Sequence, residues 1–248
     1  MRKFFATIMF CAMLLAGCGG GSNSPEDAGH VAVFFVSGHD TLFDGNSSKS
    51  YLQTTAGPDV VTALKSAGYS VETHYYADHQ DVVDGYGGFN QLVSDLKFFR
   101  KGDKTKVVVI AHSHGGVWAH AAITQASQLT VDLLVDLDVS SYGWTFVAHD
   151  TLAIGGDPRN KYQGRYDVED VVPNNVQTAL EVRSGDHPPL IGIFLYEEYD
   201  EERNIRPDGS TARLEKYLSS TNHTEVHQAS GTTMKYVNQW LINRLGGR

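Results

Sequence analysis

A buried strand that runs directly into a serine is the feature that most constrains this chain. The segment 106–116 reads K-V-V-V-I-A-H-S-H-G-G, and its apolar run 107–110 ends abruptly in small and polar residues around Ser113. A short continuous apolar run is typical of a strand that is buried on both faces of a parallel sheet. Residues 115–128 then place apolar side chains at roughly helical spacing. We therefore predict a strand, a tight turn that carries Ser113, and a helix.

The residues two positions before and two positions after this serine are small. Ala111 and Gly115 occupy these positions, where the backbones of a strand and of the helix that follows it pass close together. The pattern A-x-S-x-G resembles the G-x-S-x-G nucleophile elbow of the α/β-hydrolases, and of lipases in particular. The resemblance implies that Ser113 is a nucleophile. The alternative is a serine that only caps the helix.

Strand and helix patterns alternate along the rest of the chain. Apolar runs or alternation predict strands at 31–36, 70–76, 133–139 and 176–182, with weaker strand patterns at 190–199 and 214–217. One-sided apolar spacing predicts helices at 57–67, 89–100 and 233–245. This order predicts an α/β domain, a doubly wound and mostly parallel sheet with helices on both faces. Together with the serine motif, it implies the α/β-hydrolase fold.

The first 17 residues have the composition of a secretion signal. Arg2 and Lys3 precede an apolar segment, 4–14, that is too short for a membrane span, which needs about 20 residues. The segment ends in L-A-G followed by Cys18, which resembles a bacterial lipobox. The resemblance implies cleavage before Cys18 and attachment of lipid to it. The alternatives are an ordinary secretory signal and a transmembrane anchor.

The resemblance to a lipoprotein implies a location in the bacterial cell envelope, with a lipid anchor in the membrane. Residues 18–29 are rich in Gly, Ser and Asn, and we expect them to form a flexible tether to one domain at 30–248. Gly19 follows the cysteine where an aspartate would signal retention in the inner membrane, which implies the outer membrane of a Gram-negative cell. The irregular stretch 140–175 is long for a connection, and we expect a lid over the site. A large surface loop is the alternative.

Cysteine content and charge exclude several classes of protein. Cys11 and Cys18 are the only cysteines, so the domain at 30–248 has no disulfide and no catalytic thiolate. The net charge is −9, and removal of Arg2 and Lys3 with the signal lowers it by two more. Such an acidic protein is a poor candidate for binding nucleic acid. The 11 histidines show no zinc-hydrolase spacing, and we expect no metal and no cofactor.

A serine nucleophile needs a base within hydrogen-bond reach and an acid that orients the base. The chain order in α/β-hydrolases is serine, acid, histidine. Asp138, in the segment L-D-V-S-S, resembles the acid in the L-D-P-A segment of pancreatic-type lipases, with Val139 in place of the proline. Asp186 stands after the next predicted strand, where most α/β-hydrolases have the acid, and is an alternative. Asp136 is a second alternative, although we expect it to lie inside the strand.

The base is expected between the last strand and the final helix. His223 and His227 both lie there. We favour His223, because lipase-like hydrolases often have an apolar residue three positions after the histidine, as Val226 is here. His227 is the alternative.

Backbone N–H groups must stabilise the oxyanion of the tetrahedral intermediate. The elbow implies the N–H of His114, at the start of the helix. The segment S-G-H-D after the first strand resembles the H-G-x turn of lipases, with Ser37 in place of the histidine. This resemblance implies the N–H of His39 as the second donor, with Asp40 as the alternative.

These residues predict a membrane-tethered serine hydrolase that cleaves a carboxylic ester, or a lipid, through an acyl-enzyme. The resemblance to lipases and esterases is what implies the ester. A peptidase, an amidase or a thioesterase would use the same groups. A different class of alternative is a non-catalytic envelope lipoprotein that uses the fold as a binding module. The sequence does not indicate an oligomeric state.

Overall fold

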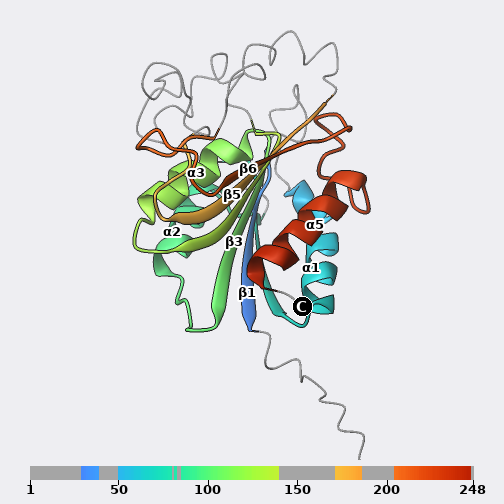
Figure 1. Ribbon diagram of the computed structural model, residues 1–248. Coiled ribbons are helices and arrows are strands. Elements are labelled where there is room, and N and C mark those ends of the chain that lie inside the picture. Colours follow the sequence, from blue (N-terminus) through green and yellow to red (C-terminus); the bar gives the residue numbers. More distant parts are fainter. Residues whose placement is uncertain are drawn as a thin grey trace, which may run out of the picture.

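The computed structural model describes residues 29–38, 50–79, 81–82, 85–139, 171–185 and 204–246 (Figure 1). Several predictions fall outside these residues. They are the signal peptide at 1–17, the lipidated Cys18, the tether up to residue 28, the strand pattern at 190–199, and all but the last five residues of the expected lid.

Six strands form one sheet in the order β2-β1-β3-β4-β5-β6, and every neighbouring pair is parallel. The strands are β1 (His30–Val36), β2 (Ser70–Tyr76), β3 (Thr105–His112), β4 (Val131–Leu137), β5 (Val176–Arg183) and β6 (Leu214–Leu218). After β2 the chain crosses back over β1 to form β3, so the direction of strand addition reverses between β1 and β3. In open parallel sheets, sites form beyond the carboxyl ends of the strands near such a reversal.

Helices cover both faces of the sheet (Figure 1). On one face α1 (Ala56–Ser66) packs against α5 (Thr232–Leu245), and on the other α2 (Phe89–Phe98) packs against α3 (Gly115–Gln125). A short 3-10 helix, η2 (Tyr51–Gln53), precedes α1. Among the described residues, no helix combines the length and the apolar character needed to cross a membrane.

The central strands are apolar along their length because both of their faces are buried. Phe34 and Val109 pack into the apolar cluster under α2 and α3, whereas Phe35 and Ile110 pack into the cluster under α1 and α5. All four side chains are fully buried. This arrangement accounts for the continuous apolar runs in the sequence. The doubly wound parallel sheet is the predicted fold class.

One helix is shorter than predicted. The pattern predicts a helix to residue 128, but α3 ends at Gln125. The reason is a side chain from a distant segment, since the amide of Asn175 donates hydrogen bonds to the carbonyl oxygens of Ile123, Ala126 and Leu129 at 2.9 to 3.3 Å. These bonds satisfy carbonyl groups that a helix end leaves without partners.

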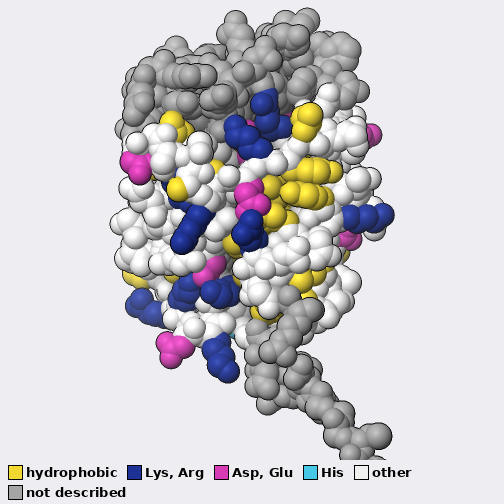
Figure 2. Space-filling view, in the orientation of Figure 1, with side chains coloured by type: hydrophobic (Ala, Val, Ile, Leu, Met, Phe, Trp, Pro, Cys, Tyr) yellow, Lys and Arg dark blue, Asp and Glu magenta, His cyan; other side chains and the backbone are white. Residues whose placement is uncertain are grey.

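Charged and apolar side chains share the face of the molecule that Figure 2 shows. On the face seen in Figure 2, basic and acidic side chains are interspersed, with apolar side chains between them. The described residues with large exposed apolar side chains include Phe98 and Leu218, which are 68% and 73% exposed.

Candidate active site

The predicted nucleophile stands at the sharp turn between β3 and α3. Ser113 has a φ of 55°, in the left-handed region that few residues other than glycine adopt. Its N–H donates to the carbonyl oxygen of Leu137 at 3.2 Å, and its own carbonyl oxygen accepts from the N–H of Gly116 at 3.0 Å. These bonds tie the turn to β4 and to the first turn of α3. A strained backbone that is held in this way is typical of a functional position.

The close approach of two chain segments explains the small residues around the serine. A Cβ atom on Gly115 would lie 2.4 Å from the carbonyl oxygen of Val36, at the end of β1. A Cβ atom on Gly38 would lie 2.7 Å from the Cβ of Ser113. The loop after β1 therefore lies directly against the elbow, and neither glycine can carry a side chain without a shift of backbone.

The three residues predicted as a catalytic triad lie together beyond the carboxyl ends of the strands. Oγ of Ser113 is 3.0 Å from Nε2 of His223, and Nδ1 of His223 is 2.7 Å from Oδ2 of Asp138. Because a carboxylate can only accept, Nδ1 carries the proton and Nε2 is left to accept from the serine hydroxyl. His223 and Asp138 are buried, and Ser113 is half-buried. This arrangement can remove the hydroxyl proton and hold the imidazolium that forms.

The acid is held by its backbone and by a neighbouring strand. Asp138 follows β4 with a φ of 48°, and its N–H donates to the carbonyl oxygen of Val182 at 2.7 Å. Its Oδ1 accepts the N–H of Ser184, just beyond β5, also at 2.7 Å. Burial acts to raise the pKa of Asp138, but hydrogen bonds from His223 and Ser184 outweigh it and lower that pKa. The carboxylate therefore stays charged at neutral pH. Sequence reasoning missed Ser184, since a backbone donor from another strand leaves no motif.

Of the two alternative acids, Asp136 is described, and it has a partner other than His223. Asp136 lies inside β4, where it is fully buried and contacts Nε2 of His120 on α3 at 3.1 and 3.2 Å. The prediction that Asp136 lies within the strand is correct. Asp186 lies outside the described residues.

One of the two expected oxyanion donors is described. His114 precedes α3, so its N–H stands at the positive end of the helix dipole. A Cβ atom on Gly38 would lie 2.9 Å from this nitrogen, so the loop after β1 runs beside it. His39 and the alternative Asp40 follow Gly38 but lie outside the described residues.

The histidines on either side of the serine point to opposite faces of the sheet. His112 contacts the hydroxyl of Tyr51 on the η2 side. Nδ1 of His114 is 2.9 Å from both carboxylate oxygens of Asp78, which also accepts the indole N–H of Trp118. Neither imidazole hydrogen-bonds to Ser113 among the contacts of the described residues. Sequence reasoning missed Tyr51 and Asp78, because neither residue stands in a recognisable motif.

The alternative base is buried beside the site but does not reach the serine. Nδ1 of His227 is 3.1 Å from Oγ1 of Thr55, and its ring packs against Tyr51 and His112. Burial, with a smaller contribution from His223, lowers the pKa of His227 to about 4. His227 is therefore neutral at pH 7. In the described part of the chain, no group of three or more His, Cys, Asp or Glu side chains could hold a metal ion.

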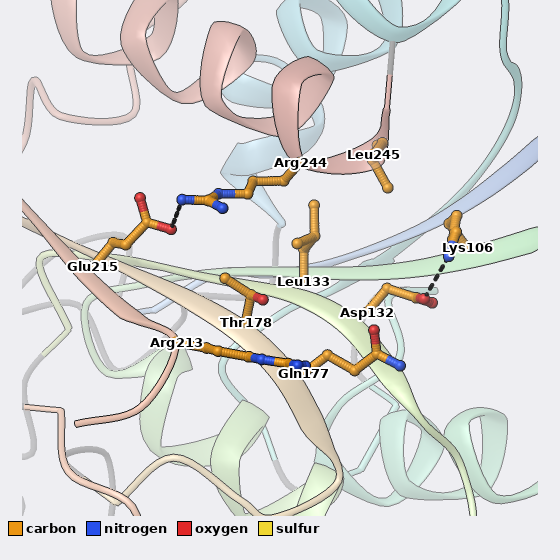
Figure 3. A pocket seen from close by; sticks show the side chains of 9 residues that line it. All are labelled: Lys106, Asp132, Leu133, Gln177, Thr178, Arg213, Glu215, Arg244 and Leu245. Carbon is orange, nitrogen blue, oxygen red and sulfur yellow. Dashed lines mark hydrogen bonds and ion pairs between the residues drawn. The ribbon is translucent and has the colours of Figure 1, made fainter. Parts of the chain in front are cut away.

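A pocket of about 540 Å³ opens at the other end of the sheet (Figure 3). It is lined by residues at the starts of β3 to β6 and by the end of α5. Two ion pairs lie along its wall, Glu215 with Arg244 at 2.5 Å and Asp132 with Lys106 at 3.1 Å. The pocket is therefore separate from the triad, which lies beyond the opposite ends of these strands.

Comparison with known proteins identifies the fold. No protein-family model and no curated protein matches the sequence. A hydrolase of Agrobacterium vitis has a similar structure, with a TM-score of 0.50 and 11% identity over 90% of each chain. A peroxisomal α/β-hydrolase of Saccharomyces cerevisiae has a TM-score of 0.48 and 12% identity, over 88% of this chain and 78% of that one. Est1E of Butyrivibrio proteoclasticus, bound to ferulic acid, has a TM-score of 0.46 and 14% identity, over 90% of this chain and 94% of that one. The strand order and the first of these similarities show the α/β-hydrolase fold.

Proposed function

We propose that this protein is a serine hydrolase that cleaves carboxylic esters, with Ser113 as nucleophile, His223 as base and Asp138 as the acid that orients the base. The observation that carries the proposal is the continuous hydrogen-bonded series from Oγ of Ser113 through the imidazole to the carboxylate, with contacts of 3.0 and 2.7 Å. A serine hydroxyl is a weak nucleophile at neutral pH, and such a series is what activates it.

In the first half of the reaction, Oγ of Ser113 attacks the ester carbonyl carbon while Nε2 of His223 takes the hydroxyl proton. The charge that develops on the carbonyl oxygen is stabilised by the N–H of His114 and by a second N–H, which we assign to His39. Each such donor contributes about 2.7 to 4 kcal/mol to the stability of the transition state. His223 then gives its proton to the leaving alkoxide, and the alcohol departs from the acyl-enzyme.

In the second half, water replaces the alcohol. Nε2 of His223 takes a proton from the water as its oxygen attacks the acyl carbon. The proton returns to Oγ of Ser113 when the new intermediate collapses, and the carboxylic acid leaves. Throughout, Asp138 accepts the Nδ1–H of His223, which fixes the ring and stabilises its positive charge.

The choice of an ester rests on the resemblance of the elbow and of the L-D-V segment to those of lipases. A fold does not fix a substrate, so the assay must compare acyl groups. Because p-nitrophenyl esters are intrinsically more reactive than matched p-nitroanilides, the assay compares rate enhancements over the uncatalysed reactions, with a matched thioester as the third substrate, and we expect the largest enhancement for the ester. A preference for the anilide or for the thioester would identify an amidase or a thioesterase instead.

We also propose that lipid on Cys18 anchors the domain in the bacterial envelope. The lipid would tether the domain through residues 18–29. The acidic composition agrees with a small-molecule substrate and not with nucleic acid.

The decisive experiment is labelling with a fluorophosphonate, which reacts only with an activated serine and releases fluoride. We expect the label on Ser113 in the folded protein, and its loss in the His223→Ala variant. Ser127→Ala is the matched control, since this serine is exposed and lies beyond the end of α3. A folded protein that takes no label would refute the proposal and favour a non-catalytic binding module.

A further inference from the structure

A tyrosine hydroxyl joins the loop after β1 to the residue before the nucleophile. The N–H of Gly38 donates to the hydroxyl oxygen of Tyr51 at 2.9 Å. The same hydroxyl contacts Nδ1 of His112. Gly38 is buried and Tyr51 is half-buried, so the contacts are largely shielded from water.

The imidazole of His112 continues the series on its other side. Nε2 of His112 is 2.9 Å from the carbonyl oxygen of His223. A carbonyl oxygen can only accept, so Nε2 carries a proton. Burial, reinforced by His227 and His223, holds the pKa of His112 well below its usual range, and the ring is neutral. Its Nδ1 is therefore an acceptor, and the hydroxyl of Tyr51 donates to it.

The direction of every bond in the series is thus fixed. The N–H of Gly38 donates to Tyr51, the hydroxyl of Tyr51 donates to His112, and the Nε2–H of His112 donates to the backbone of His223. One end of the series is the loop that runs beside the N–H of His114. The other end is the backbone of the residue whose side chain contacts Ser113.

We propose that Tyr51 and His112 are positioning residues, which hold the loop after β1, at Gly38, and the loop of the catalytic base at a fixed separation around the nucleophile. This inference rests on the proposed function. Neither side chain acts on the substrate. They act through the two backbones that they join, and catalysis is sensitive to such placement, since a displacement of about 1 Å can cost about 100-fold in rate.

The first test is Tyr51→Phe, which removes one oxygen atom and leaves two buried groups without their partner. Tyr69→Phe is the matched control, because the hydroxyl of Tyr69 also donates to a single group, the carbonyl oxygen of Leu245 at 2.9 Å, at the far end of the sheet. We expect Tyr51→Phe to lower kcat by about 10- to 100-fold with KM changed by less than about twofold. Tyr69→Phe should leave both constants near those of the wild type.

The second test separates hydrogen bonding from packing at His112. His112→Gln keeps one acceptor and one donor, whereas His112→Phe keeps a ring but neither polar group. If the series positions the loops, the Gln variant retains more activity than the Phe variant at equal folded fraction. A Phe variant that is as active as the Gln variant, or more active, would show that His112 only fills space.

Failure of this inference can be told from failure of the proposed function. A wild-type protein that neither hydrolyses esters nor takes the fluorophosphonate would refute the proposed function. The positioning role is then judged by NMR, from the Nδ1–H resonance of His223 and the hydrogen exchange of the Gly38 amide. Both must change in Tyr51→Phe and not in Tyr69→Phe. The inference is overturned if Tyr51→Phe keeps wild-type kinetics in an active protein, or the wild-type value of either NMR signal in an inactive one.

Discussion

Nε2 of His112 donates a hydrogen bond to the carbonyl oxygen of His223 at 2.9 Å, although the two residues are 111 positions apart in the sequence. The rings of His112 and His223 also lie close, with centroids 4.8 Å apart, and the ring of His227 packs against His112 with centroids 4.4 Å apart. Burial penalises the charged form of an imidazole, and it lowers the pKa of His112 and of His227, so these two rings are neutral at pH 7.

Stability should therefore fall in mild acid. His227 has a pKa of about 4 in the folded protein, against about 6.5 in the unfolded chain. Between these values the unfolded chain binds more protons, so the free energy of unfolding is highest above pH 6.5 and decreases as the pH falls towards 4. We expect a loss of about 1 to 3 kcal/mol from this residue. Urea unfolding at pH 7 and at pH 5 measures it.

His227→Gln is the variant that tests the origin of this loss, since glutamine does not titrate. Its free energy of unfolding should depend less on pH over the same range than that of the wild type. His30→Gln is the control, because His30 is a partly exposed histidine at the start of β1. An equal pH dependence in wild type and His227→Gln would contradict the prediction.

Asp138→Asn should abolish most activity without unfolding the protein. If the asparagine oxygen keeps the N–H of Ser184, its NH₂ group faces Nδ1 of His223 and favours the wrong tautomer of the base. We expect kcat for ester hydrolysis to fall by about 10⁴-fold. Asp136→Asn serves as the control, because that carboxylate contacts His120 and not His223. A larger loss of kcat in Asp136→Asn than in Asp138→Asn would show that Asp138 is not the acid that orients His223.

Gly115→Ala should destabilise the elbow. The new methyl group would lie 2.4 Å from the carbonyl oxygen of Val36, and β1 is too tightly packed to move away freely. We expect the free energy of unfolding to decrease by about 1 to 3 kcal/mol. Gly102→Ala makes a suitable comparison, since its methyl group would meet only Oγ1 of Thr105, at 3.2 Å. Similar unfolding curves for the two variants would count against close packing at the elbow.

Cys18→Ser should release the protein from the membrane fraction. If the cysteine carries lipid, a fatty acid with an alkyne group will label the wild-type protein in a bacterial host, and the variant will take up none. Cys11→Ser is the matched control and should be labelled like the wild type. Label on the Cys18→Ser variant would contradict the lipobox interpretation.

The sequence by itself determines the fold class, because the information is local. Runs such as 31–36 and 107–110 have no polar side on which a sheet could meet water, so they specify strands covered on both faces. The small residues around Ser113 specify a tight turn for a similar reason, since a bulky side chain would meet the neighbouring backbone there. The end of α3 was not predictable in this way, because it depends on Asn175, about 50 residues away.

Only the tertiary structure decides which polar groups meet. His223 and His227 are equivalent by position in the sequence, yet one contacts Ser113 and the other contacts Thr55. The partners of Ser113 and Asp138 are 110 and 85 residues away from them, and no periodicity encodes such distances. Two further links have no sequence motif either. The hydroxyl of Tyr51 joins Gly38 to His112, and the backbone N–H of Ser184 donates to Asp138. Their geometry is set by how parallel strands align their carboxyl ends, which is a property of the whole sheet.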